Sequence, residues 1–337
     1  MRLLDPKKLA DLAAALAAQG YRVVAPVEDG DVVRLREWRP GEAIVTDVIP
    51  VNAAKDFLLP RSEVIARYTL DGDDFAPQPV RPEAPRTVLL CVRPCDAAAL
   101  AALDTVFNWD YEDEFYNARR AATTVVTLGC SAADDQCFCT SVGGVPDATA
   151  GADAVLRPAD GGTHLVFDAF GEKGEALAAA AGTLLVDGNA ALDPPADVPT
   201  RFDAGAVTEW LRDNFESDRW REFSLACLGC GACAYACPTC HCFDIQDESN
   251  RKEAVRYRNW DTCAVALFTA HAGGHNPRPD QSARWRQRVM HKFAYFPERF
   301  GRLACTGCGR CARLCQAGMA ISDVCQAIDR ASKAPNP

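Results

Sequence analysis

The sequence predicts an α+β protein in which an N-terminal α/β domain precedes a mainly helical domain. Three observations lead to this fold class. Residues 86–130 contain two aliphatic segments with a helix-like segment between them, residues 186–204 are rich in proline, aspartate and glycine, and the cysteine-rich C-terminal part contains the helix-like segment 282–296. We therefore expect domains at 1–204 and 205–337. A chain of 337 residues, 48% of them hydrophobic, is long enough for two cores.

The first 20 residues predict an amphipathic helix that ends at Gly20. Its apolar positions are Leu3, Leu4, Leu9, Leu12 and Leu16. Charged residues interrupt this segment early, so it does not have the apolar centre of a signal peptide. No other apolar run approaches the roughly 20 residues that cross a bilayer. These features predict a cytoplasmic protein.

The segments 86–92 and 123–130 are short runs of aliphatic and β-branched residues, which is typical of buried strands. Between them, the alanine- and leucine-rich segment 96–107 predicts a helix with Asp96 at its N-cap. A strand, a helix and a second strand in this order predict a βαβ unit. The segment 186–204 then predicts a linker or surface loop.

Charge divides the chain at a similar place. Residues 1–217 contain 19 Lys and Arg against 35 Asp and Glu, whereas residues 218–337 contain 17 against 11. The N-terminal part is therefore acidic, with a net charge of −16, and the C-terminal part is basic, with a net charge of +6.

The chain contains 17 cysteines. A reducing cytosol keeps thiols free, so in a protein without a secretion signal this number does not indicate a disulfide framework. Metal binding is the better explanation.

Two cysteine motifs carry the strongest signal. Both have the spacing C-x2-C-x2-C-x3-C, and the first is followed by Pro238. Three thiolates at three-residue intervals can bind three corners of an iron–sulfur cube, and the fourth cysteine then binds the other cube. This scheme assigns one [4Fe-4S] cluster to Cys227, Cys230, Cys233 and Cys315, and a second to Cys305, Cys308, Cys311 and Cys237. The C-terminal domain is then ferredoxin-like. A pair of zinc sites is the alternative, but zinc usually takes two separated cysteine pairs.

A second cysteine set lies in the N-terminal domain. Cys95 and Cys130 follow the two predicted strands, and Cys137 and Cys139 lie in the loop after the second one. Loops that leave parallel strands meet at the carboxyl edge of the sheet, where ligands bind. We therefore expect a third [4Fe-4S] cluster at these four cysteines, with free core cysteines or a zinc site as the alternatives.

Five cysteines remain outside these sets. Cys91, Cys263 and Cys325 are interpreted as small buried apolar residues. Cys240 and Cys242 lie close to Cys237, so they are either alternative ligands or thiols that interact with the ligands without binding iron themselves.

Several Lys and Arg residues follow the first cysteine motif. Cations close to an anionic cluster stabilise its reduced state, and a basic surface can bind an acidic partner. The same residues can also form an ordinary solvated surface. They are Arg278, Arg284, Arg286, Arg288, Lys292, Arg299, Arg302, Arg310 and Arg313.

The sequence lacks the motifs of other chemistries. It has no G-x-G-x-x-G after a strand, no G-x4-G-K-[ST], no G-x-S-x-G and no H-E-x-x-H. Nothing in the motifs therefore indicates a flavin, a nicotinamide or a hydrolytic nucleophile in this chain, and no catalytic residue is predicted.

With segments such as CVRPCDAAALAALDTVF, CPTCHCFDIQDE, AGGHNPRP and CTGCGRC in view, the chain resembles the beta subunit of cytosolic NiFe hydrogenases of the sulfhydrogenase type. It is also similar to the A subunit of anaerobic sulfite reductase. The resemblance covers about residues 85–325. Two positions depart from the pattern: Cys91 stands where glycine is usual, and Gln316 replaces a proline after the last motif cysteine.

The resemblance implies an electron-transfer subunit without substrate chemistry of its own. Such a subunit connects a flavin subunit that handles NAD(P)H with a catalytic subunit, either NiFe hydrogenase or sulfite reductase. The alternatives are an iron–sulfur protein that binds nucleic acid through its basic C-terminal surface, and a free-standing reductase. Nucleic-acid binding is disfavoured by the acidic N-terminal half. A reductase would need a cluster with fewer than four protein ligands, for which the sequence gives no indication.

Overall fold

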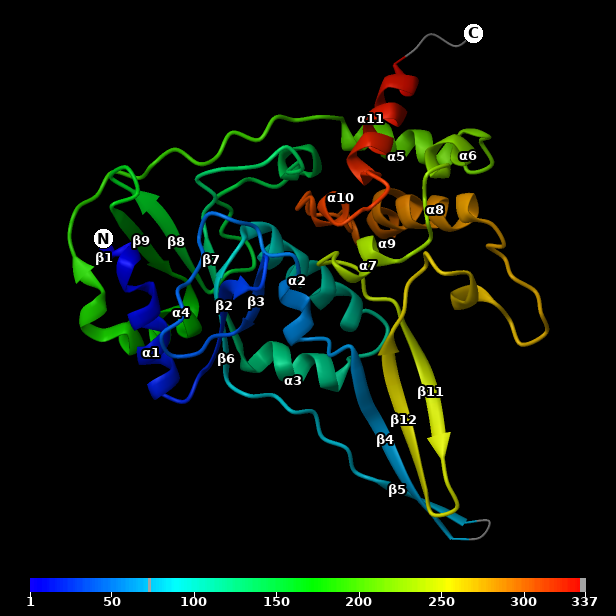
Figure 1. The fold of residues 1–337 in the computed structure, drawn as a ribbon, viewed down its shortest axis with the longest axis horizontal. Coiled ribbons are helices and arrows are strands. Elements are labelled where there is room, and N and C mark those ends of the chain that lie inside the picture. Colours follow the sequence, from blue (N-terminus) through cyan, green and yellow to red (C-terminus); the bar gives the residue numbers. More distant parts are fainter. Residues whose placement is uncertain (72–73, 334–337) are drawn as a thin grey trace.

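The computed structural model describes residues 1–71 and 74–333. Its largest element is an eight-stranded mixed sheet with the strand order β10-β1-β9-β8-β7-β6-β2-β3 (Figure 1). The middle strands β8, β7, β6 and β2 are parallel, and antiparallel strands extend the sheet on both sides. The strands are β1 (Arg2–Leu4), β2 (Arg22–Asp29), β3 (Val32–Glu37), β6 (Thr87–Val92), β7 (Thr123–Leu128), β8 (Ala154–Ala159), β9 (His164–Ala169) and β10 (Val186–Asp187).

The two predicted strands are confirmed as β6 and β7, which lie side by side and are buried along their whole length. The predicted helix between them is also present, as α2 (Pro94–Phe107), and is followed by α3 (Glu114–Ala122). The prediction for Asp96 was wrong. The helix begins at Pro94, whose fixed φ suits a first helical position, and Arg93 takes the N-cap position. Asp96 is instead fully buried in the first turn.

Helices cover both faces of this sheet. α1 (Leu9–Ala18) and α4 (Gly171–Ala181) pack on one face, and α2 and α3 pack on the other. The N-terminal helix is therefore present but shorter than expected. Leu3 and Leu4 form part of β1 because both side chains are buried where this strand pairs with β9.

Cys91 has a left-handed backbone conformation, with φ of 57°. The register of β6 against β7 shifts at this point, between Leu89 and Val92. Glycine adopts such a conformation without strain, whereas a residue with a Cβ does not. The local geometry thus explains why glycine suits this position, and the thiol of Cys91 is buried in the sheet as expected.

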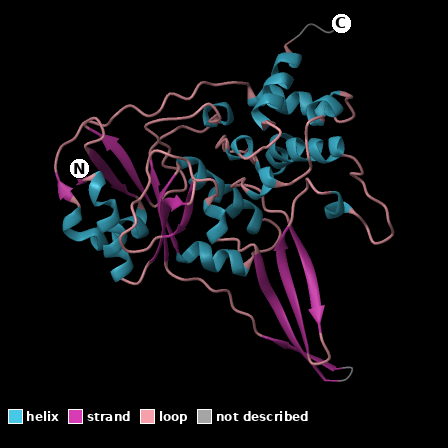
Figure 2. Ribbon diagram, viewed as in Figure 1, coloured by secondary structure: helices cyan, strands magenta, loops and turns pink. Residues whose placement is uncertain are grey.

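A second sheet of four strands projects from the body of the molecule as an arm (Figure 2). Its strand order is β11-β12-β4-β5, with all pairs antiparallel. The strands are β4 (Ser62–Asp71), β5 (Asp74–Gln78), β11 (Phe243–Ser249) and β12 (Glu253–Trp260). The arm therefore combines strands from both sides of the expected boundary at 204, and the C-terminal part contributes a hairpin in addition to its helices.

Buried ion pairs hold the base of the arm. Glu63 of β4 pairs with both Arg119 of α3 and Arg258 of β12, at 2.6 Å in the latter case. Arg258 also pairs with Asp113, which caps α3. These contacts join the arm to the α/β domain.

The predicted linker or surface loop 186–204 is confirmed only in part: Val186 and Asp187 form β10, and after it the chain has no further helix or strand until Asp203 caps α5. The helices of the C-terminal part are α5 (Ala204–Asp213), α6 (Arg219–Ser224), α7 (Ala232–Tyr235), α8 (Gln281–Met290), α9 (Phe296–Phe300), α10 (Arg310–Arg313) and α11 (Ile321–Ser332). A π-helical turn, His291–Tyr295, joins α8 to α9, so the predicted helical segment 282–296 is confirmed.

The C-terminal helices share a core that also includes Phe138 and Phe202 from outside them. Cys325 of α11 is buried in this core, as predicted. Within residues 1–71 and 74–333, we find no helix whose length and hydrophobicity would let it cross a bilayer.

Candidate iron–sulfur sites

A first cavity is lined by four cysteines of the C-terminal part: Cys227, Cys230, Cys233 and Cys315. These are the four cysteines that the motif spacing assigns to one cluster, three from the first motif and the fourth from the second; we call this the interleaved scheme. Gly231 lets the loop close around the cavity because its φ is 75° and a Cβ there would lie 2.7 Å from Thr262 Cγ2. α7 begins directly after it. The 227–233 loop and the distant Cys315 thus face the same space.

A second cavity is lined by Cys237, Cys305, Cys308 and Cys311, again the grouping of the interleaved scheme. The two cavities are neighbours, since Arg288, which lines the second, donates to the carbonyl of Cys233 of the first at 2.9 Å. An electron on one site would therefore have a second site nearby.

Both cavities contain buried hydrogen-bond donors that have no partner among the described residues. Trp285, whose Nε1 is such a donor, lines the first cavity, and Arg288 and Thr306, with Nε and Oγ1, line the second. Native proteins rarely leave such donors unpaired. Inorganic sulfide and thiolate sulfur in an iron–sulfur cluster accept N–H and O–H hydrogen bonds. The donor sets of both cavities therefore fit a cluster.

Hydrogen bonds to individual thiol sulfurs add to this pattern. Gln281 Nε2 donates to Cys227 Sγ at 3.1 Å, and the Met319 N–H donates to Cys315 Sγ at 3.3 Å. In the second cavity, Lys292 Nζ donates to Cys237 Sγ at 3.2 Å. Donors directed at sulfur favour the thiolate form, which is the form that binds iron.

Two buried cations, Arg288 and Lys292, line the second cavity, and Lys55 donates to the nearby Cys240 carbonyl; their exposed fractions are 3%, 3% and 2%. Among the described residues, none of them forms a salt bridge with a carboxylate. Burial opposes the charge of Lys292, but the nearby sulfurs of Cys237 and Cys240 outweigh it and raise its pKa. Buried cations need anions nearby. The ionised thiolates of a cluster site would supply them.

Burial of these cations also limits the alternative of nucleic-acid binding. Arg288, Lys292 and Arg310 belong to the basic set from the sequence, yet all three are buried against cysteines or, for Arg310, against Asp96. They cannot contribute to an exposed basic surface.

The structure also brings the N-terminal cysteine set together. Cys95 lies in the first turn of α2, Cys130 follows β7, and the charges of Cys130, Cys137 and Cys139 interact with one another. Cys95 interacts with Cys130 in the same way. Burial raises the pKa of all four free thiols, in Cys139 to about 11. A metal or cluster would therefore have to displace protons when it binds.

The N-terminal set lies directly against the second cavity. The Phe138 N–H donates to the Gly307 carbonyl at 2.9 Å. Arg313 of α10 donates to Cys308 O at 2.7 Å and to Cys137 Sγ at 3.3 Å. The two loops that carry these cysteines therefore touch along their backbones, and the N-terminal set lies next to the second site.

A substitution at Gly307 tests the contact between these two loops. Its φ is 65°, and a Cβ there would lie 2.5 Å from the Cα and N of Cys139. We expect Gly307→Ala to destabilise the protein by about 2–4 kcal/mol, because it adds a backbone clash to left-handed strain. Thermal unfolding without oxygen measures the effect. Gly301→Ala is the matched control, since Gly301 has a φ of 67° and open space around its Cβ position. Equal losses in both variants would contradict the contact.

Sequence reasoning missed Lys55 at these sites. Lys55 lies far from the cysteine motifs along the chain, yet its Nζ donates to the Cys240 carbonyl at 2.8 Å and lies 4.2 Å from the ring centre of Trp260. Cys263 is buried, as interpreted from the sequence. The thiol of Cys240 accepts a hydrogen bond from Arg288 Nη1 at 3.4 Å.

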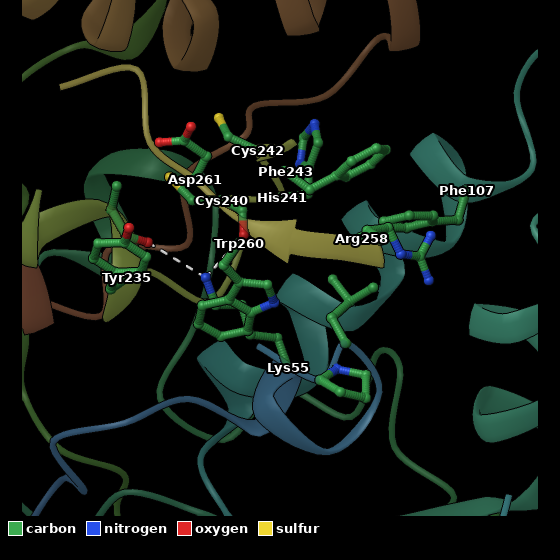
Figure 3. A pocket seen from close by; sticks show the side chains of 13 residues that line it. Lys55, Phe107, Tyr235, Cys240, His241, Cys242, Phe243, Arg258, Trp260 and Asp261 are labelled. Atoms are coloured by element: carbon green, nitrogen blue, oxygen red, sulfur yellow. Dashed lines mark hydrogen bonds between the residues drawn. The ribbon is translucent and has the colours of Figure 1, made fainter. Parts of the chain in front are cut away.

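A further small cavity, shown in Figure 3, lies where the α/β domain, the cysteine motif and the arm meet. Its wall includes Lys55, Phe107, Cys240, His241 and Cys242. Burial lowers the pKa of His241 to about 4, so this imidazole is neutral near pH 7.

Within the described parts of the chain, no three Cys, His, Asp or Glu side chains come close enough together to surround one metal ion. A cubane cluster does not require such convergence, because each thiolate binds a different iron atom.

Comparison with known proteins supports an iron–sulfur domain in the C-terminal part of the chain. Residues 226–319 match the family model of the 4Fe-4S dicluster domain. Over 323 residues the chain is 28% identical to sulfhydrogenase 2 subunit beta of Pyrococcus furiosus, and the match covers 88% of this chain and 89% of that protein. No solved structure matches the chain. The resemblance to a sulfhydrogenase beta subunit is confirmed, and similarity to anaerobic sulfite reductase stays a prediction.

Proposed function

We propose that this chain is the iron–sulfur electron-transfer subunit of an oxidoreductase complex. The observation that carries the proposal is the pair of neighbouring cavities, each lined by four cysteines from two interleaved motifs and each containing buried donors that have no partner within residues 1–71 and 74–333. The dicluster match and the similarity to a hydrogenase beta subunit support it.

The ligand assignment follows the cavities. We assign the first cluster to Cys227, Cys230, Cys233 and Cys315, and the second to Cys305, Cys308, Cys311 and Cys237. The third, at Cys95, Cys130, Cys137 and Cys139, is supported by the proximity of these thiols and by the contact of their loop with the second motif. We retain 1–204 and 205–337 as the proposed domains.

When bound, each cluster supplies one reversible electron. The protein supplies the position and the electrostatic field. Lys292 and Arg288 place positive charge beside the second site, which favours its reduced and more negative state. Gln281 directs an N–H group at Cys227 of the first site, and Trp285, whose buried Nε1 has no partner among the described residues, lines it. Among the twelve assigned ligands, Cys230 of the first site is the one with an exposed side chain. This site is therefore the best placed to exchange electrons with a partner.

The partners are inferred from the relative. We propose that this chain transfers electrons between a flavin subunit that handles NAD(P)H and a catalytic subunit such as a NiFe hydrogenase, with sulfite reductase as the other candidate. The chain has no predicted catalytic residue, so substrate chemistry is assigned to the partners.

The test is the iron content of the chain purified without oxygen. We expect about twelve iron atoms per chain, four for each of three clusters. Cys95→Ser should reduce this to about eight and remove one reduced-state EPR signal, because one ligand of the third cluster is lost. Cys91→Ala is the control, since Cys91 is a buried core thiol that is not among the twelve assigned ligands. A Cys95→Ser protein with unchanged iron and an unchanged spectrum would remove the third cluster from the proposal.

A further inference from the structure

A groove of about 550 Å³ lies where the arm meets the α/β domain. Its walls come from β2, β4, α3, the residues 56–60 and the segment 80–85. None of the twelve assigned cluster ligands lines it, so it is separate from the iron–sulfur sites. Its volume lies in the range of small-molecule sites, which often form between the structural units of a protein. The groove is therefore a candidate binding site that electron transfer does not use.

One buried arginine fixes the walls of this groove. Arg119 of α3 is 8% exposed. Its Nε donates to the Glu83 carbonyl at 3.1 Å, and its Nη1 donates to the Leu58 and Phe115 carbonyls at 3.3 Å each. Its Nη2 pairs with the carboxylate of Glu63 in the arm. A single side chain thus ties the arm, α3 and both connecting segments together. A site whose walls are already fixed has less order to gain when it binds a ligand.

Three further arginines line the groove from different parts of the chain: Arg22 of β2, Arg67 of β4 and Arg81. Arg22 pairs with Glu37 at 3.0 Å. Arg67 and Arg81 are exposed, and among the described residues neither pairs with a carboxylate. Residues 1–217 have a net charge of −16, so these cations gather against the charge of their domain. Guanidinium groups bind carboxylates and phosphates through paired hydrogen bonds. The two arginines without a partner can therefore hold an anion.

The groove also contains three carboxylates, two of which have partners. Glu63 pairs with Arg119. Asp56 accepts a hydrogen bond from Asn52 Nδ2 at 3.2 Å. The third, Glu83, is exposed. With four arginines against three carboxylates along its walls, the groove favours a negatively charged ligand over a cation.

Apolar side chains form much of the remaining wall. They include Phe57, Pro60, Val64, Pro82 and Pro85. Apolar surface adds to the affinity for a ligand when both are removed from water. The groove therefore suits a ligand that has an apolar body as well as an anionic group.

We propose that the groove binds a small organic anion. Arg67 and Arg81 hold its phosphate or carboxylate group, and its apolar body lies against Phe57 and the prolines of the wall. Binding is non-covalent and transfers no electron. The inference goes beyond the electron-transfer role and does not depend on the clusters, because no cluster ligand takes part in it.

The experiment measures binding to the intact, cluster-loaded chain by isothermal titration calorimetry without oxygen. The probes are phenyl phosphate and phthalate, which carry a benzene ring and different anionic groups, and inorganic phosphate, which has no apolar body. We expect a ring-bearing probe to bind, and inorganic phosphate to bind roughly tenfold more weakly because it buries no apolar surface. The tighter of the two ring-bearing probes identifies the anionic group.

Substitutions then locate the bound probe. Arg67→Gln and Arg81→Gln should each weaken binding about tenfold, because a hydrogen bond to a charged group is lost. Glu83→Gln should strengthen binding, because it removes a negative charge from the wall. Arg251→Gln is the matched control, since Arg251 is an exposed arginine of the same arm, between β11 and β12, that does not line the groove. All four side chains are exposed, so these variants should keep the fold.

Either of two results would overturn the inference. In one, neither ring-bearing probe binds at millimolar concentration. In the other, a probe binds, but the double variant Arg67→Gln/Arg81→Gln binds it as tightly as the wild type does, so the anion lies elsewhere on the chain. Iron content reports on the proposed function and calorimetry reports on the groove, so failure of one is distinguishable from failure of the other.

Discussion

Arg310→Met is expected to destabilise the protein by about 3–5 kcal/mol, because it leaves a buried charge without its partner. The side chains of Arg310 and Asp96 are 1% and 0% exposed, and they form a 2.8 Å ion pair. Arg310 Nε also donates to the Pro50 carbonyl at 2.8 Å. The pair joins α10, between the second and third sites, to the first turn of α2. Unfolding by urea without oxygen measures the loss.

A double variant separates the charge from the packing. Asp96→Leu combined with Arg310→Met removes both charges and fills the space with apolar groups, so it should recover much of the stability lost in the single variant. If the double variant is as unstable as the two single losses added together, the two residues do not act as a pair and the explanation fails.

The location of this ion pair shows which parts of the structure were predictable from the sequence. The strands 87–92 and 123–128, the helix between them and the grouping of the eight C-terminal cysteines depend on local patterns: aliphatic runs, helix periodicity and ligand spacing. Asp96 looked like an N-cap because N-capping is the commonest local role for aspartate before a helix. Its real partner, Arg310, is 214 residues away along the chain, and no local sequence pattern reveals such a pairing.

The arm was missed for a related reason. All seven residues of β11 are exposed, so the strand has no apolar face and therefore no alternating pattern to detect. Its pairing through β12 with β4 joins parts of the chain that lie almost 200 residues apart. Glu63 and Arg258, which fix this contact, are buried charges whose role depends on the assembled fold.

Lys292 is the cation most directly coupled to a proposed cluster. It is 3% exposed, and its Nζ donates to Cys237 Sγ at 3.2 Å, to Thr239 Oγ1 at 2.9 Å and to the Ala304 carbonyl at 2.8 Å. A unit charge about 6 Å from a cluster is worth about 3 kcal/mol at an effective dielectric constant of about 20. For a one-electron couple this energy corresponds to about 120 mV.

Lys292→Met is therefore expected to lower the midpoint potential of the second cluster by about 100 mV, because the reduced state loses a nearby cation and a hydrogen bond to sulfur. Redox titration followed by EPR measures the shift. Lys292→Arg keeps the charge and should restore most of the potential. Lys55→Met is the matched control: Lys55 is as deeply buried, but its Nζ donates to carbonyl oxygens of Ala234 and Cys240 rather than to sulfur, so its shift should be smaller. Equal shifts in the two methionine variants would mean that the contact with Cys237 has no special effect on the cluster.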